Sequence, residues 1–167
     1  RKAIGKRTIF NLIGPLANPA GVARQLIGIA RPDYVEIYGR ALASLGAEAA
    51  MIVSGEEGLD ELSGAGMSRI FKIGDLPVGE AVEPGEAGLP TAATQAIRGG
   101  DATFNAAALR RLLQGDRGPY RDAVLLNASA ALIVAGRAAN WRDGVEEAEE
   151  VLDNGLANTL LDCWISF

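Results

Sequence analysis

The chain has 167 residues, of which 49% are hydrophobic, and a formal net charge of −5 at pH 7. This length and composition suffice for one globular domain with a core, and they exclude a disordered chain. The absence of histidine excludes a Ser-His-Asp triad, a Cys-His pair and a His-ligated zinc site within these residues, and the single cysteine excludes an internal disulfide. Any chemistry must therefore come from carboxylates, Arg, Lys, backbone amides or a bound metal.

The charge is unevenly distributed along the chain. Residues 1–40 carry seven basic and two acidic side chains, so this segment is positive and the remainder is strongly negative. A basic segment and an acidic loop in one domain can bind an anion together with its counter-cation. Ordinary solvated faces are the plainer explanation of the same pattern.

No apolar run reaches the roughly 18 residues of a membrane-spanning helix, and the sequence shows no export signal pattern. We therefore expect a cytoplasmic protein without membrane contact. The lone Cys163, flanked by apolar residues, suits a reducing compartment, and we expect its side chain to be buried in the core.

The first predicted elements form a strand, a helix and a second strand. Residues 7–19 are apolar but interrupted by glycine and proline, which predicts a packed loop lining a pocket. Residues 23–30 predict a buried strand, and Pro32 begins a helix whose apolar positions recur every three or four residues up to Gly46. A second apolar strand follows at 49–53. This order predicts a βαβ unit in a mostly parallel sheet.

An acidic loop follows the second strand and contains the neighbouring carboxylates Asp60 and Glu61. Carboxylates just beyond a buried strand occupy the position where α/β proteins place ligand sites. Paired oxygen ligands without His or Cys suit Mg²⁺, which usually completes its coordination with water and substrate phosphates. Taken alone, these residues favour the simpler explanation of a solvated acidic loop.

The rest of the chain is predicted to form a hairpin and then helices. Alternating patterns at 68–73 and 78–82 predict two paired strands. Asp101 is a suitable N-cap for a helix over 102–114, whose apolar face is expected to contain Phe104, Ala108, Leu109 and Leu112 or Leu113. Three further helices are expected at 120–136, 141–152 and 156–164, and the first of them is apolar enough to be buried on nearly all sides.

Five short motifs stand out along the chain. They are Arg1-x-x-x-Gly-x-Arg-Thr-Ile-Phe-Asn-Leu-Ile-Gly-Pro-Leu-Ala-Asn-Pro, Gln25-Leu-Ile-Gly, Gly58-Leu-Asp-Glu, Arg98-Gly-Gly-Asp and Arg121-Asp-Ala-Val-Leu-Leu-Asn-Ala. In this order and spacing they resemble the C-terminal half of the anthranilate phosphoribosyltransferase family, over the whole chain. The resemblance implies an α/β fold with a mostly parallel sheet flanked by helices. It also implies a single domain over residues 1–167, namely a truncated nucleoside phosphorylase/phosphoribosyltransferase C-terminal-like domain that lacks the N-terminal helical domain and the phosphate loop.

The same resemblance implies an enzyme of tryptophan biosynthesis that joins anthranilate to phosphoribosyl pyrophosphate and releases pyrophosphate. It implies that Asp60 and Glu61 hold Mg²⁺ on the pyrophosphate and that Arg1 contacts the anthranilate carboxylate. It further implies that Gly14 and Pro15 lie beside the anthranilate channel, so we expect Pro15 to share a cleft with the carboxylate pair. No side chain is predicted to be catalytic, because the aromatic amine is already a nucleophile at neutral pH.

The resemblance also sets expectations for the assembly. We expect the full-length protein to be a homodimer. Because the chain begins with Arg1 and resembles only half of the family's length, we expect a fragment that is inactive alone and that exposes a sheet edge or an apolar face.

Three alternative functions remain open at this point. A pyrimidine nucleoside phosphorylase would share the fold and use phosphate as its nucleophile. A non-catalytic paralogue that binds nucleic acid would need a basic surface, whereas this chain is acidic, so we expect no nucleic-acid partner. A protein-binding α/β domain is the third alternative.

Overall fold

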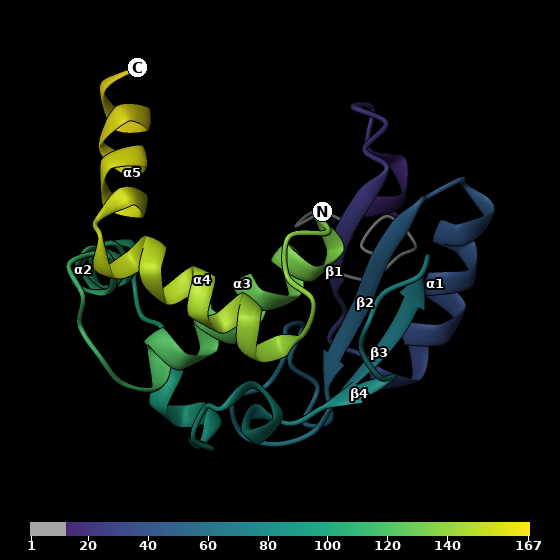
Figure 1. Ribbon diagram of the computed structural model, residues 1–167, viewed down its shortest axis with the longest axis horizontal. Helices are drawn as coiled ribbons and strands as arrows, with labels where there is room; N and C mark the ends of the chain where they lie inside the picture. Colours follow the sequence, from purple (N-terminus) through teal and green to yellow (C-terminus); the bar gives the residue numbers. More distant parts are fainter. Residues whose placement is uncertain (1–12) are drawn as a thin grey trace, which may run out of the picture.

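The computed structural model describes residues 13–167 and shows a four-stranded sheet with helices on both faces (Figure 1). The strands lie in the order of the chain and are β1 (Arg24–Gly28), β2 (Ala49–Gly55), β3 (Ser68–Ile73) and β4 (Ala81–Val82). The predicted α/β class is therefore confirmed. No helix among residues 13–167 is both long and apolar enough to span a membrane.

The sheet is mixed, which corrects the prediction of a mostly parallel sheet. The short turn η3 (Pro32–Tyr34) and helix α1 (Val35–Ser44) connect β1 to β2, and these two strands are parallel as predicted. In contrast, β3 is antiparallel to both of its neighbours. The connection from β2 to β3 contains no helix that could carry the chain back across the sheet, so β3 returns in the opposite direction. The predicted hairpin is confirmed, although β4 is short.

Every residue of β2 is buried because both faces of the sheet are covered. Met51 and Val53 belong to the larger core cluster beneath the C-terminal helices, whereas Ala50 and Ile52 pack in the cluster beneath α1. This alternation explains why the strand appears as a continuous apolar run in the sequence. It also places the C-terminal end of β2 between two helical layers.

The second half of the chain is helical. Its helices are α2 (Ala102–Leu113), α3 (Pro119–Val134), α4 (Trp141–Asp153) and α5 (Leu156–Ser166), and the short turns η2 (Pro15–Ala17), η4 (Pro84–Ala87) and η5 (Thr94–Ile97) lie before them. Helix α3 packs on β1, β2 and α4. Asp101 caps α2 as predicted, accepting a 2.8 Å hydrogen bond from the Phe104 amide. The predicted apolar face of α2 is only partly correct: Leu112 and Leu113 are buried, whereas Phe104 and Leu109 are exposed.

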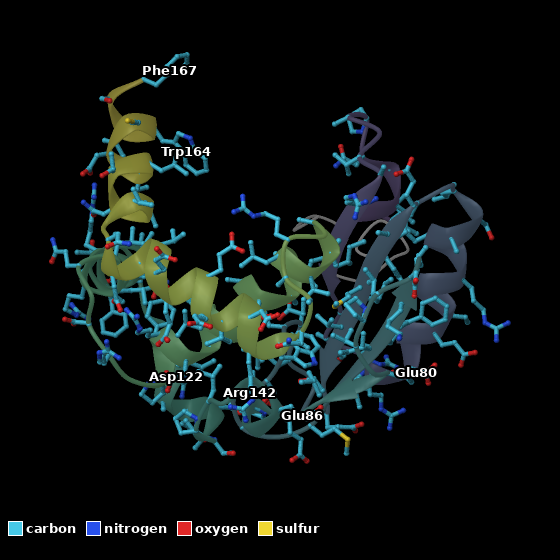
Figure 2. The ribbon with its side chains drawn as sticks, viewed as in Figure 1. Glu80, Glu86, Asp122, Arg142, Trp164 and Phe167 are labelled. Atoms are coloured by element: carbon cyan, nitrogen blue, oxygen red, sulfur yellow. The ribbon has the colours of Figure 1, made fainter. Side chains whose placement is uncertain are left out.

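Helix α5 projects from the body of the domain (Figure 1) and contains no buried residue. Trp164 and Phe167 are exposed near its end (Figure 2). Cys163 is also exposed, so the prediction that it lies in the core is wrong. The cause is that α5 packs only against α4 and α2, which leaves most of its surface uncovered. The exposed apolar side chains of α5 include Leu156, Leu160 and Trp164. The expected exposure of a sheet edge or apolar face, which concerned missing neighbours of the sheet, stays a prediction.

Candidate functional site

The site is formed where the loop after β2 lies over the C-terminal end of β1. The Gly55 amide donates to the carbonyl oxygens of Leu59 (2.9 Å) and Glu61 (3.1 Å), so the loop folds back on the strand that it leaves. Gly58 has φ +87°, a left-handed conformation that favours glycine, and its amide closes the turn onto the Gly55 carbonyl at 2.9 Å. The sequence Gly-x-x-Gly therefore produces a compact loop that carries Asp60 and Glu61.

Gly28 lets this loop approach β1 closely. A Cβ atom added to Gly28 would lie 1.6 Å from the Asp60 carbonyl oxygen and 2.5 Å from the Asp60 carbonyl carbon. No side chain fits at such a distance, so this position requires glycine. Gly28 thus determines how closely the Asp60 backbone can approach the C-terminal end of β1.

Asn127 of α3 holds the loop from the other side. Its Oδ1 accepts a 2.9 Å hydrogen bond from the Leu62 amide, and its Nδ2 donates 3.0 Å hydrogen bonds to the carbonyl oxygens of Leu62 and Ala123. The Leu62 side chain is fully buried in the larger core cluster. The residue directly after Glu61 is therefore fixed through both its backbone and its side chain.

A third contact joins the loop to the segment above the cleft. The Ser63 hydroxyl donates a short hydrogen bond to Glu57 Oε1, and the Thr94 hydroxyl donates to the same oxygen at 3.2 Å. Thr94 begins η5. The carboxylate loop and η5 are thus connected by side chains that lie outside the predicted ligand pair.

A cleft of about 890 Å³ opens between this loop, β1, η5 and α3. Asp60 and Glu61 line it together with Gly28, Thr94, Arg98, Tyr120 and Asn127. Partial burial, and then the negative charge of Asp60, raise the pKa of Glu61 above its usual value. Because the negative charges of these neighbouring carboxylates repel each other, a cation between them is favoured.

The carboxylate pair suits an Mg²⁺ ion that is also coordinated by phosphate oxygens, and not one whose ligands all come from the protein. Among residues 13–167, no group of three or more His, Cys, Asp or Glu side chains could hold a metal ion. Two carboxylates supply only part of an octahedral shell, so water and phosphate oxygens would complete it. Arg98 adds a basic residue to the same cleft, which suits an anionic ligand.

Pro15 does not line the cleft that holds the carboxylate pair. Pro15 lines a separate cleft of about 300 Å³ together with Ala23, Gln25, Ala47 and Glu48, and no described residue lines both clefts. These neighbours lie at the N-terminal ends of β1 and β2, whereas Asp60 and Glu61 lie over the C-terminal ends. The rise along β1 alone separates the two ends by about 13 Å.

The predicted anthranilate contacts remain predictions. Gly14 precedes the η2 turn beside Pro15, and Arg1 lies outside the described residues. Of the predicted site residues, the structure brings Asp60 and Glu61 together in one cleft. The roles of Gly28 and Asn127 were not predicted, although both residues belong to motifs noted in the sequence, Gln25-Leu-Ile-Gly and Leu125-Leu-Asn-Ala.

Comparison with known proteins identifies the domain. The model of the glycosyl transferase family, a/b domain, matches residues 1–158. The chain belongs to this glycosyl transferase family. Within it, the chain is similar to the anthranilate phosphoribosyltransferase of Novosphingobium aromaticivorans, with 60% identity over 99% of the chain and 51% of the relative. The chain thus spans about half the length of the curated relatives that it matches.

Solved structures agree with the fold of this glycosyl transferase domain. The crystal structure of anthranilate phosphoribosyltransferase from Thermus thermophilus matches with a TM-score of 0.90 and 41% identity over 99% of the chain and 49% of that structure. The Saccharomyces cerevisiae enzyme in complex with PRPP and Mg matches with a TM-score of 0.84 and 30% identity over 97% of the chain and 47% of that structure. The sheet, the helices and the carboxylate loop described above therefore belong to a known transferase architecture.

Proposed function

We propose that this chain is part of an enzyme that transfers the phosphoribosyl group from phosphoribosyl pyrophosphate to anthranilate, in tryptophan biosynthesis. The products would be N-(5-phosphoribosyl)anthranilate and pyrophosphate. The observation that carries the proposal is the Asp60–Glu61 pair in one cleft of a domain 60% identical to a named anthranilate phosphoribosyltransferase. None of the three alternative functions accounts for that sequence identity.

In this reaction the bond between ribose C1 and the pyrophosphate oxygen breaks, and its electron pair leaves with pyrophosphate. The anthranilate nitrogen bonds to C1 and releases one proton to the solvent. Mg²⁺, when bound, would offset the negative charge that develops on the departing pyrophosphate. Asp60 and Glu61 would hold that ion through their carboxylate oxygens. Arg98, in the same cleft, would add positive charge near the pyrophosphate.

We also propose roles for residues outside the cleft and for the remainder of the full-length protein. Arg1 would grip the anthranilate carboxylate, and Gly14 and Pro15 would line the path of anthranilate. The phosphate loop and helical domain would come from the other half of the relatives' length. We further propose a cytoplasmic homodimer that binds no nucleic acid and depends on Mg²⁺.

The test uses a protein of the relatives' full length and follows anthranilate fluorescence in the presence of phosphoribosyl pyrophosphate and Mg²⁺. Asp60→Asn and Glu61→Gln should each lower kcat/KM by about 100-fold or more, since the metal supplies several kcal/mol of transition-state stabilisation. Glu56→Gln is the matched control, because Glu56 lies in the same loop but pairs with Arg69 at 2.6 Å instead of lining the cleft.

The alternatives predict different results with the same protein. Phosphate-dependent cleavage of a pyrimidine nucleoside, without anthranilate consumption, would favour the phosphorylase. A gel shift at low salt with no transferase activity would favour the nucleic-acid-binding paralogue. Either result would replace the proposal.

A further inference from the structure

We propose that Asn127 is a positioning residue for the carboxylate pair, which sets the geometry in which Asp60 and Glu61 can bind a divalent cation. The inference extends the proposed function and rests on it only for the identity of the reaction. Asn127 lines the same cleft as the pair. It acts through the peptide groups of Leu62, the residue that follows Glu61.

The contact has two points and therefore controls orientation as well as distance. The Asn127 carboxamide accepts from the Leu62 amide at 2.9 Å and donates to the Leu62 carbonyl at 3.0 Å. Its second N–H donates to the Ala123 carbonyl, one turn earlier in α3, at 3.0 Å. The carboxamide cannot rotate without losing these bonds, so the Leu62 backbone is held in one orientation relative to α3.

The opposite side of the loop is equally restricted. The Asp60 carbonyl lies over Gly28, and the Glu61 carbonyl accepts from the Gly55 amide at 3.1 Å. Asp60 and Glu61 thus lie between two sets of contacts: Gly28 of β1 and the Gly55 amide of β2 on one side, and the Asn127 side chain of α3, through Leu62, on the other. Without Asn127, the loop would keep its contacts with β1 and β2 and the buried Leu62 side chain, but it would lose the hydrogen bonds that orient its backbone relative to α3.

This attachment matters because coordination of a small cation tolerates little displacement of its ligands. A ligand constellation has to be held within about 0.5 Å of its productive geometry. Groups that orient metal ligands from the next layer typically cost 10–100-fold in metal affinity when they are removed. We therefore expect Asn127→Ala to weaken divalent-cation binding by about 10-fold to 100-fold.

The chain offers two matched controls. Ser129 lies on the same helix, is fully buried, and donates a 2.9 Å hydrogen bond to the Trp141 carbonyl, away from the carboxylate loop. Ser129→Ala therefore tests the loss of a buried hydrogen bond in α3. Asn105 makes the same kind of two-point contact with the Gly100 amide (2.8 Å) and carbonyl (3.1 Å), so Asn105→Ala tests an equivalent loss at α2.

The experiment measures Mn²⁺ binding, with pyrophosphate present, by electron paramagnetic resonance on the full-length protein. Hydrogen exchange of the Leu62 amide is measured in the same variants without metal. Asn127→Ala should weaken Mn²⁺ binding 10-fold to 100-fold and accelerate exchange at Leu62, and it should raise the Mg²⁺ concentration for half-maximal transferase activity by a similar factor. The two controls should leave all three quantities within about twofold of the parent protein.

If Asn127→Ala does not fold, Asn127→Leu keeps the number and branching of the side-chain heavy atoms while it removes the same hydrogen bonds, and the same results are expected. The inference is overturned if Mn²⁺ affinity in the Asn127 variants changes no more than in Ser129→Ala. Failure of the proposed function appears differently, as a parent protein that consumes no anthranilate. In that case a selective loss of Mn²⁺ binding in the Asn127 variants would still support the positioning role.

Discussion

The Cα atom of Gly28 lies directly beneath the Asp60 carbonyl, so close that a methyl group there would overlap the oxygen at 1.6 Å. The end of one strand and the loop after its parallel neighbour are thus in backbone contact. This contact explains why a glycine is needed in a strand that is otherwise suited to larger residues. The same contact predicts that Gly28 controls the position of the carboxylate loop.

Gly28→Ala should displace the carboxylate loop and lower the free energy of unfolding by about 1–3 kcal/mol, the usual effect of forcing extra volume into a packed position. It should also weaken Mn²⁺ binding, because Asp60 is moved directly. Urea unfolding and Mn²⁺ titration measure the two effects. Gly64→Ala is the control, since a Cβ atom there meets nothing within 4 Å. Equal behaviour of the two variants would contradict the close-contact argument.

Arg121 and Asp153 form an ion pair in which replacement of one partner should destabilise the domain more than replacement of the other. Its side chain is only 2% exposed, and its Nη2 lies 2.8 Å from Oδ1 of Asp153, which is 43% exposed. Within the described residues, none of its guanidinium nitrogens makes a hydrogen bond. The burial of this charge is therefore compensated mainly by Asp153.

Asp153→Asn should consequently destabilise the domain by about 3 kcal/mol, because it leaves a buried guanidinium with less compensation. Arg121→Met should change stability by less, because it removes the buried charge and leaves Asp153 in contact with water. Thermal and urea unfolding of the two variants measure the difference. Asp162→Asn, in an exposed pair with Arg110, should cost less than about 1 kcal/mol. A larger loss in Arg121→Met than in Asp153→Asn would refute this account.

Asp122, in the first turn of α3, predicts a pH-dependent effect (Figure 2). Burial raises its pKa above 3.8, the charge of Arg121 opposes the shift, and Glu149 adds to it. Because the carboxyl pKa is raised, the folded state holds the proton of Asp122 at pH values above 3.8, where the unfolded state has already released it. The free energy of unfolding therefore falls as the pH rises from 3.8 through the folded pKa of this group.

Asp122→Asn should therefore raise the free energy of unfolding at pH 7, and the gain should disappear toward pH 3.8. Urea unfolding across this pH range provides the measurement. Asp143→Asn, in the first turn of α4, controls for removing an acidic residue near a helix N-terminus. A gain that stays constant with pH would show that titration of Asp122 is not its origin.

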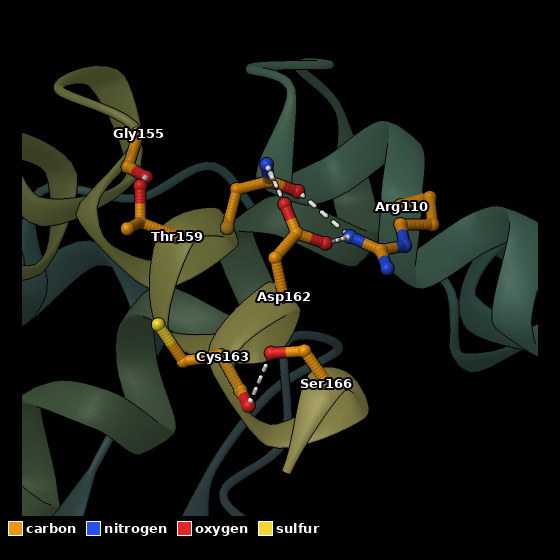
Figure 3. Close-up of polar contacts among 7 residues, drawn as sticks. Arg110, Gly155, Thr159, Asp162, Cys163 and Ser166 are labelled. Carbon is orange, nitrogen blue, oxygen red and sulfur yellow. Dashed lines mark hydrogen bonds and ion pairs between the residues drawn. The ribbon is translucent and has the colours of Figure 1, made fainter.

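Helix α5 should be the least protected of the long helices. Arg110 of α2 holds it through contacts with Asp162 (2.6 Å) and Asn158 (3.1 Å), both exposed or partly exposed (Figure 3). No residue of α5 is buried, whereas α3 contributes Leu125, Leu126 and Ile133 to the core. Few buried contacts imply a low free energy of local opening.

In hydrogen exchange on the 167-residue chain, amides of α5 should exchange at least about tenfold faster than those of α3. Arg110→Ala should accelerate exchange in α5 further while hardly changing global unfolding, because exposed ion pairs contribute little. Lys72→Ala, which removes contacts between β3 and the following loop, should leave exchange in α5 unchanged. Protection of α5 equal to that of α3 would contradict the prediction.

Local patterns in the sequence predicted much of the fold. The apolar run of β2, the stripe of α1, the Asp101 cap and the uniformly apolar α3 each depend on residues within a few positions of one another, so they can be recognised without the tertiary structure. The carboxylate pair was also predicted, because its place after a buried strand is a local feature. Its expected role, binding Mg²⁺ on the pyrophosphate, came from the resemblance of the five motifs to a known family.

The tertiary structure alone decided the relationships between distant residues. Asn127 meets Leu62 across 65 positions of the chain, and no local pattern specifies that contact. The antiparallel course of β3, the exposure of Cys163 and the separation of Pro15 from Asp60 likewise depend on where whole elements pack. Residue types and periodicities determine which segments form strands, helices and ligand loops; the packing of α3 and β1 around one loop determines where its two carboxylates lie.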